Sequence, residues 1–254
     1  MAFPVAVEAL QLFADTLALS STITETEREA LLALPATPRR VQAHREILRT
    51  GESADQAYLI ADGFVARFAQ LADGARQTVS LHIVGDLLDM ASLVLPAAAI
   101  PITALTTSTV LQIPRDALRQ LASDHRGIAA AFWRGCAVEG SITTQWLVGI
   151  GRRDARARLA HLLCEMGVRW QHTGRYDCHR FPFPMTQEQI ADALALTAVH
   201  VNRTLQTLRR EGLIQVANRE VIILDWGALA DAASFDGAYL HLPIPAVDPR
   251  ARSA

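Results

Sequence analysis

The stretch Thr186–Ile214 constrains the fold of this chain more than any other part of its sequence. Two helical patterns follow each other there, and each begins at a threonine, Thr186 or Thr197, that can cap a helix. Gln189 completes a capping box for the first helix, and Gly212 ends the second. Two short helices separated by so tight a turn are typical of a helix-turn-helix.

The second helix of this motif is expected to turn its polar edge to solvent, because Val201, Leu205 and Leu208 form an apolar face that must pack inward. An α-helix fits the DNA major groove, where Arg and Asn side chains pair with guanine and adenine edges. We therefore expect base contacts from five residues of this helix: Ala198, Val199, His200, Asn202 and Arg203. Phosphate contacts are expected from the helix ends and the hairpin that follows: Thr186, Gln187, Thr197, Arg209 and Arg219.

Apolar runs at 213–216 and 221–224 predict that hairpin, which would be the wing of a winged helix. The local charge agrees with a DNA partner. All 24 basic residues are arginines, and residues 152–219 hold 11 of them against 6 acidic residues, whereas the whole chain has a net charge of −2. A solvated arginine face is the alternative explanation for this local excess.

The first half of the chain has a different pattern of apolar residues and turns. Helical spacing at 5–19 and a capping box at Thr24 and Glu27 predict two N-terminal helices. Turn pairs such as Asp62-Gly63 and Asp73-Gly74 then separate short apolar runs, which predict strands at 46–48, 57–61, 65–70, 78–83, 102–105 and 109–113. So many short strands indicate a small barrel or jelly roll.

A long helix is predicted between these two regions, ending at a hinge near Gly149–Asp154. Apolar residues recur there in steps of four and three, which is the pattern of a coiled-coil seam. A dimer interface is therefore expected at Ile128, Phe132, Gly135, Ile142 and Trp146. The alternative is a core helix of a single domain.

The chain is thus expected to have an α+β fold, with an N-terminal antiparallel β-barrel or jelly roll, a long dimerisation helix and a C-terminal winged helix-turn-helix. The expected parts are a barrel sensor domain with N-terminal helices at 1–122, the dimerisation helix and hinge at 123–151, the DNA-binding domain at 152–230 and a C-terminal extension at 231–254. The extension shows little periodicity, so we expect it to be extended or mobile.

Other classes of protein are disfavoured by composition. Three cysteines with wide spacing give no disulfide framework, which favours the cytoplasm. Cys178 and His179, with His172 nearby, lack a CxxC partner, so no metal site is expected. The longest uncharged run, 90–114, contains three prolines and predicts buried strands rather than a membrane span. No secretory signal is expected, because Met1–Phe13 has no basic segment.

The order of barrel, long helix, arginine-rich hinge and winged helix resembles the Crp/Fnr transcription regulators over about residues 20–225. The resemblance is most specific in RRDARARLAHLLCEMG (152–167) and TQEQIADALALTAVHVNRTLQTLRREGLI (186–214). It implies a homodimer that binds a near-palindromic double-stranded operator through two recognition helices. RNA polymerase is a candidate further partner.

The chain departs from this family at the residues that would hold an effector. Gly85-Asp86 stands where cyclic-AMP-binding members have Gly-Glu, and Ala98-Ala99 replaces their Arg-Ser pair. Thr143 and Thr144 match polar positions that contact the base, which leaves Gly85, Asp86, Thr143 and Thr144 as a candidate effector pocket. The missing arginine argues against a cyclic nucleotide. No cysteine precedes Cys136, so an iron–sulfur cluster is not expected, and no cofactor is predicted.

Two other functions are weighed against a DNA-binding regulator. The first is a sensor or protein-interaction module with a vestigial winged helix. The second is an enzyme on a cupin-like barrel, which needs a His-x-His metal cluster that the isolated His82 does not provide. We therefore expect no enzymatic activity.

Overall fold

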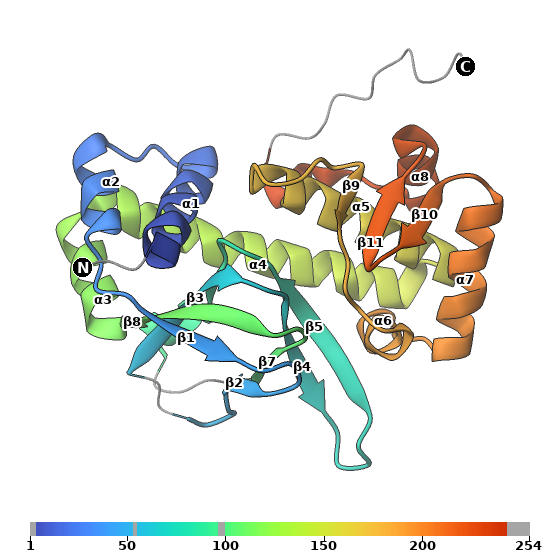
Figure 1. The fold of residues 1–254 in the computed structure, drawn as a ribbon, viewed down its shortest axis with the longest axis horizontal. Coiled ribbons are helices and arrows are strands. Elements are labelled where there is room, and N and C mark those ends of the chain that lie inside the picture. Colours follow the sequence, from blue (N-terminus) through green and yellow to red (C-terminus); the bar gives the residue numbers. More distant parts are fainter. Residues whose placement is uncertain (1–3, 53–54, 96–99, 243–254) are drawn as a thin grey trace. The chain divides into compact units, whose positions relative to one another are not determined.

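The computed structural model describes residues 4–52, 55–95 and 100–242, and the chain divides into two compact units, Met1–Gly140 and Ser141–Ala254. Figure 1 shows both units and the helix α4 (Arg126–Arg152), inside which the division falls. All strand pairs among the described residues are antiparallel. No helix among residues 4–52, 55–95 and 100–242 is both long and apolar enough to cross a lipid bilayer.

Unit 1 is built around two four-stranded sheets, so the predicted antiparallel barrel or jelly roll is confirmed. One sheet has the order β1 (Thr37–Val41), β8 (Ser108–Pro114), β3 (Gln56–Asp62) and β6 (Leu87–Leu88). The other has the order β2 (Glu46–Leu48), β7 (Ile102–Ala104), β4 (Val65–Gln70) and β5 (Arg76–His82). Both sheets contribute buried side chains to one apolar cluster, which includes Ile60, Val65, Ile102 and Val110.

One of the predicted Asp-Gly turn pairs, Asp62-Gly63, lies in the turn between β3 and β4. Gly63 has a φ of +104°, which glycine adopts without steric cost. A Cβ atom at this position would lie 2.7 Å from the Cα atom of Ser108 on β8. The glycine therefore allows both the turn and the close approach of the neighbouring strand.

A second cluster of unit 1 lies between β3, β8 and four helices: α1 (Pro4–Ser20), α2 (Glu25–Leu32), α3 (Arg115–Asp124) and the start of α4. The capping box of Thr24 and Glu27 is confirmed. The Glu27 carboxylate also accepts a hydrogen bond from the Gly127 amide at 2.8 Å, so α2 caps the start of α4. The long helix is therefore separate from α3 and begins at Arg126.

The predicted dimer seam is wrong for its first residues. Ile128 is fully buried and Phe132 is only 6% exposed in the second cluster, where Phe132 stacks on Phe13 with ring centroids 6.3 Å apart. Gly135 is half-buried, and a Cβ atom there would meet Met90, which belongs to the 3-10 turn η1 (Met90–Leu93). At Ile128 and Phe132 the apolar face that suggested a coiled coil instead packs within the core of unit 1.

Unit 2 is organised around α5 (Ala155–His172), of which eleven residues are buried. The other elements are β9 (Arg180–Pro182), α6 (Gln187–Leu194), α7 (Ala198–Arg210), β10 (Ile214–Ala217), β11 (Glu220–Ile223), α8 (Trp226–Ala233) and the 3-10 turn η2 (Gly237–Leu240). The predicted hinge is shorter than expected, because Gly149 and Gly151 lie inside α4 and the helix breaks only at Arg153. Asp154 then caps α5 by accepting a hydrogen bond from the Ala157 amide.

The expectation of an extended or mobile segment from residue 231 is wrong over 231–242. Helix α8 continues to Ala233, and η2 follows, with Leu240 only 2% exposed. The rings of Phe235 and Tyr239 pack against His161 on α5, with centroids 5.2 and 5.7 Å away. Aromatic packing without helical periodicity explains why the sequence pattern missed this contact. The remaining residues of the extension, 243–254, lie outside the described part.

A buried carboxyl group joins three parts of unit 2. Glu165 on α5 is fully buried, and its Oε2 atom accepts hydrogen bonds from the Trp146 indole at 3.0 Å and from the Tyr239 hydroxyl at 2.9 Å. Arg169 lies 3.7 Å from the Oε1 atom. Trp146, predicted to lie in a dimer interface, is thus bonded within its own unit. Burial raises the pKa of Glu165, although Arg169 and the two hydrogen bonds oppose this effect.

Replacing Glu165 by Gln is expected to change how the stability of unit 2 depends on pH. Because the pKa of Glu165 is raised in the folded state, its stabilising contribution is present below the ordinary value of 4.5 and is lost as pH rises through the folded value. The side-chain carbonyl of the introduced glutamine can keep both hydrogen bonds without ionising. The free energy of unfolding of Glu165→Gln relative to wild type should therefore rise as the pH increases above 4.5.

Urea unfolding followed by tryptophan fluorescence measures this difference, because Trp146, Trp170 and Trp226 all lie in unit 2. Subtracting the wild-type curve removes the contribution of every other titrating group. Parallel pH profiles for the two proteins would show that burial of Glu165 has no such effect.

Candidate nucleic-acid interface

The first helix of the helix-turn-helix, α6, is held by the predicted capping box. The Thr186 hydroxyl accepts a hydrogen bond from the Gln189 amide at 3.2 Å, and the Gln189 side chain accepts one from the Thr186 amide at 2.9 Å. The helix ends at Leu194, and Ala195 adopts the left-handed conformation with a φ of +51°. This conformation, which costs an alanine roughly 1–2 kcal/mol, reverses the chain directly into the next helix.

Helix α7 begins where the sequence predicts, because the Thr197 hydroxyl accepts a hydrogen bond from the His200 amide at 3.2 Å. Val201, Leu205 and Leu208 are buried as predicted. Thr204 is also buried, and its hydroxyl donates to the His200 carbonyl at 2.9 Å, which the pattern of apolar residues could not reveal. These four side chains fix the rotation of α7 about its axis.

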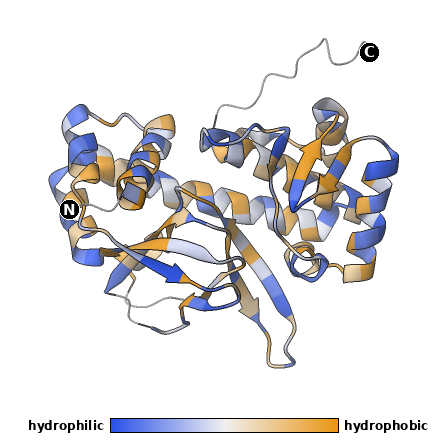
Figure 2. Cartoon of the chain, in the orientation of Figure 1, coloured by the Kyte–Doolittle hydropathy of each residue, from blue (hydrophilic) through white to orange (hydrophobic). Residues whose placement is uncertain are grey.

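Four of the five predicted base-contacting residues lie on the exposed side of α7: Val199, His200, Asn202 and Arg203. Ala198 is half-buried instead, because it starts the helix next to the turn. Val199 is 64% exposed. The Arg203 guanidinium forms no hydrogen bond or ion pair with any described residue, whereas Asn202 accepts a hydrogen bond from Gln206. Figure 2 colours much of α7 as hydrophilic.

The residues predicted to contact phosphates are all exposed, but they differ in their interactions within the protein. Thr186, Gln187 and Thr197 lie at or next to the starts of α6 and α7, where free backbone amides attract anions. Arg209 donates to the Val216 carbonyl at 3.2 Å, so it also braces the wing. In Figure 1, α6 and the start of α7 lie at the same end of unit 2.

The predicted wing is present as the hairpin of β10 and β11. Ala217 pairs with Glu220, and the two intervening residues, Asn218 and Arg219, have φ values of +53° and +64°. Two consecutive left-handed residues are the signature of a type I′ turn, whose twist matches that of a hairpin. Arg219 is therefore exposed at the tip. The strand β9, which contains Phe181, pairs with β11 and completes a three-stranded sheet.

The sequence did not predict that the first turn of α5 forms part of this surface. Asp154, Ala155 and Arg156 line one side of a groove whose other side includes Val199 and Arg203 of α7. Arg156 forms an ion pair with Glu211 at 2.7 Å, which ties α5 to the end of α7. The density of arginines at 152–158 was the available signal, but their spacing did not show which of them face α7.

The candidate effector residues are not gathered within one unit. Gly85 and Asp86 belong to unit 1, where the Asp86 carboxylate accepts a hydrogen bond from the Ile83 amide at 2.9 Å. Thr143 and Thr144 belong to unit 2 and are exposed on α4. Ala98-Ala99 lies outside the described residues. The effector pocket and the absence of a cofactor therefore stay predictions.

Unit 1 contains a buried ion cluster that the sequence did not reveal. Arg67 on β4 pairs with Glu139 on α4 at 2.5 Å and with Asp89 at 3.8 Å, and both Arg67 and Asp89 are largely buried. Asp89 has a φ of +55°, in the left-handed region, which aspartate enters more often than most residues other than glycine. The cluster joins the barrel interior to α4.

A barrel, a long helix and a winged helix-turn-helix whose exposed Arg203 guanidinium has no partner among the described residues together define a DNA-binding transcription regulator. Two family models agree with this class. Residues 38–125 match the cyclic nucleotide-binding domain, and residues 157–232 match the Crp-like helix-turn-helix domain. The chain belongs to the Crp/Fnr family.

Individual proteins of the same family are similar over most of the chain. Electron transport regulator A of Shewanella oneidensis is 23% identical over 83% of this chain and 84% of its own length. The fumarate and nitrate reduction regulatory protein of Vibrio cholerae is 23% identical over 85% and 86%. Among solved structures, FixK2 from Bradyrhizobium japonicum has a TM-score of 0.72 and 25% identity, covering 80% of this chain and all of that one. The names of both relatives describe regulatory proteins.

Proposed function

We propose that this chain is a sequence-specific DNA-binding regulator of transcription that acts in the cytoplasm as a homodimer. Each protomer would place α7 in a major groove, and the wing tip at Arg219 and the starts of α6 and α7 would contact phosphates. Two protomers would then read a near-palindromic operator with half-sites about 10–10.5 bp apart. Recognition of DNA requires no cofactor in this proposal.

The observation that carries the proposal is the exposed edge of α7. Its buried residues leave Val199, His200, Asn202 and Arg203 facing solvent, and the Arg203 guanidinium has no partner among the described residues. A guanidinium can bind the O6 and N7 atoms of guanine through two hydrogen bonds. Val199 can contact the methyl group of thymine. This chemistry supports base reading rather than a vestigial motif.

A second face of α4 supports the homodimer. Residues in alternating steps of four and three are exposed along the whole helix: Arg126, Ala130, Trp133, Ala137, Gly140, Thr144, Leu147 and Gly151. We call these residues the outer seam. Trp133 is 74% exposed and Leu147 is 69% exposed, so the seam offers two large apolar anchors separated by small residues. A second copy of α4 packed on the outer seam would bury both anchors by coiled-coil packing.

The same helix offers a route by which the barrel could influence DNA binding. Glu139 of α4 pairs with Arg67 inside the barrel unit. Beyond the break after Arg152, the Arg153 side chain donates to Gln145, and Arg158 donates to the Arg153 carbonyl at 3.0 Å and to the Leu194 carbonyl at 2.6 Å. We propose that a signal in the barrel shifts the population of α4 arrangements, and that these arginines transmit the shift to α6.

Replacing Arg203 by Ala is expected to weaken binding to operators that the wild-type protein selects from a random duplex library. The loss should be about 1–3 kcal/mol, because one bidentate contact to guanine disappears. Selection repeated with the variant should show a relaxed preference at one position of each half-site. Fluorescence anisotropy measures the affinity, and sequencing of the selected pools measures the preference.

Arg210→Ala is the matched control, because Arg210 is an exposed arginine at the other end of the same helix. This variant should keep the wild-type base preference. If Arg203→Ala lost the same factor on random duplexes as on selected ones, Arg203 would be a phosphate contact and base reading by this residue would be refuted.

Replacing Leu147 by Glu is expected to weaken the dimer, since two like charges would face each other across the outer seam. Sedimentation equilibrium should show a dissociation constant shifted toward the monomer, and operator affinity should fall with it. Val148→Glu introduces the same charge at the next residue, which is exposed but lies off the seam, and should have the smaller effect. A wild-type protein that is monomeric at micromolar concentration and still binds a palindrome fully would contradict the dimer.

A further inference from the structure

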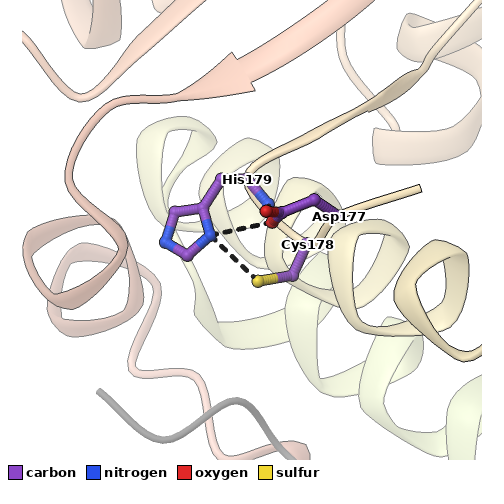
Figure 3. A group of neighbouring side chains, drawn as sticks. All are labelled: Asp177, Cys178 and His179. Carbon is purple, nitrogen blue, oxygen red and sulfur yellow. Dashed lines mark hydrogen bonds and ion pairs between the residues drawn. The ribbon is translucent and has the colours of Figure 1, made fainter. Parts of the chain in front are cut away.

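Three ligand-type side chains meet in the connection between α5 and β9. Asp177, Cys178 and His179 follow one another in the chain, and their ligand atoms all lie within 4.8 Å of one another. Figure 3 shows the three side chains turned toward a common point. The Nδ1 atom of His179 lies 3.0 Å from Oδ1 of Asp177 and 3.1 Å from Sγ of Cys178.

The arrangement does not suit a catalytic proton relay. In a nucleophile–histidine–carboxylate triad, the two partners use different nitrogens of the imidazole ring. Here the same nitrogen, Nδ1, faces both the thiol and the carboxylate. One nitrogen cannot accept a proton from the thiol while it donates to the carboxylate. Three donors that converge on one point suit a cation placed between them.

We propose that Asp177, Cys178 and His179 form a binding site for a borderline divalent metal ion of the Zn²⁺ class. Thiolate, imidazole and carboxylate are the three protein ligands that such an ion takes. Metal–ligand bonds of roughly 2.0–2.3 Å at tetrahedral angles place ligand atoms roughly 3.3–3.6 Å apart. The observed separations would need to widen by only a few tenths of an ångström. The site does not depend on the function proposed above.

The exposure of the three side chains leaves room for a fourth ligand from solvent. Cys178 is 3% exposed, whereas the side chains of Asp177 and His179 are 70% and 49% exposed. The thiol thus forms the floor of the site, and the other two ligands form its open rim. A metal ion binds cysteine as the thiolate, so an arriving ion displaces the thiol proton.

The backbone holds the three residues in place without a metal ion. The Asp177 carboxylate accepts a hydrogen bond from the His179 amide at 2.7 Å, and the Arg180 amide donates to the Asp177 carbonyl at 3.1 Å. The Cys178 carbonyl presses against Gly167 on α5, where a Cβ atom would approach it to 2.6 Å. A preformed turn of this kind reduces the entropy lost when a metal ion binds.

The site also touches the sheet that carries the wing. The His179 carbonyl accepts a hydrogen bond from the Ile223 amide of β11 at 2.7 Å. The centroid of the His179 ring lies 5.8 Å from that of the Trp226 ring. Arg180, the next residue, pairs with Glu220 across the β9–β11 ladder. An occupied site would therefore reinforce the third strand of the wing sheet.

Cobalt provides the test, because Co²⁺ is a spectroscopic substitute for Zn²⁺ and shows charge-transfer absorption when a thiolate binds it. The full-length protein, stripped with a chelator, should bind one equivalent of Co²⁺ with this absorption and release it when Zn²⁺ is added. Cys178→Ser should lose the absorption. His179→Gln and Asp177→Asn should weaken binding, and neither change threatens folding because both side chains are exposed and Asn keeps the turn hydrogen bond.

Cys136→Ser is the matched control, since Cys136 is an exposed cysteine of unit 1, and it should bind Co²⁺ as wild type does. Thermal unfolding adds a second readout, in which Zn²⁺ should raise the melting temperature of wild type but not of His179→Gln. The proposal would be overturned if wild type showed no thiolate absorption with Co²⁺, or if the absorption survived in Cys178→Ser.

Discussion

The rotation of α7 about its own axis determines which of its side chains are available to DNA. Val201, Thr204, Leu205 and Leu208 are buried against unit 2, and this burial decides which side chains remain outside. Burying a Leu or Val side chain contributes about 1.5–3 kcal/mol, so a rotated helix would lose several such contributions at once. The left-handed Ala195 and the Thr197 cap fix where the helix begins. Arg203 is thereby held outward by apolar packing, since its guanidinium has no partner in the described part of the chain.

In helix α4 too, the burial of one face decides which side chains stay outside, but here the exposed ones include large apolar residues. One face packs on the core of its own chain through Ile128 and Phe132, while Trp133 and Leu147 stay exposed on the outer seam. Exposed apolar anchors at coiled-coil spacing are a cost to a monomer and an advantage to a dimer. The helix therefore serves both the core of one protomer and, in the proposed function, the contact between two.

Strong local signals made much of the fold predictable. Capping threonines, Asp-Gly turns and the spacing of Val201, Leu205 and Leu208 depend on neighbouring residues, so the helix-turn-helix and most barrel strands could be predicted from the sequence. Contacts between distant segments could not. Nothing near Ile128 shows that it packs on α1 rather than on a second chain, and nothing near Tyr239 shows that its hydroxyl reaches Glu165. Arg67 likewise meets Asp89 and Glu139 only after the barrel has closed.

In the proposed complex, Arg203 reads a guanine edge in the major groove. Each guanine of a selected operator can be replaced, one at a time, with 7-deazaguanine, which lacks the N7 acceptor but still pairs with cytosine. We expect one position per half-site at which this replacement weakens binding of the wild-type protein but leaves binding of Arg203→Ala unchanged. Replacements that weaken both proteins equally at every guanine, or neither protein at any of them, would contradict this role of Arg203.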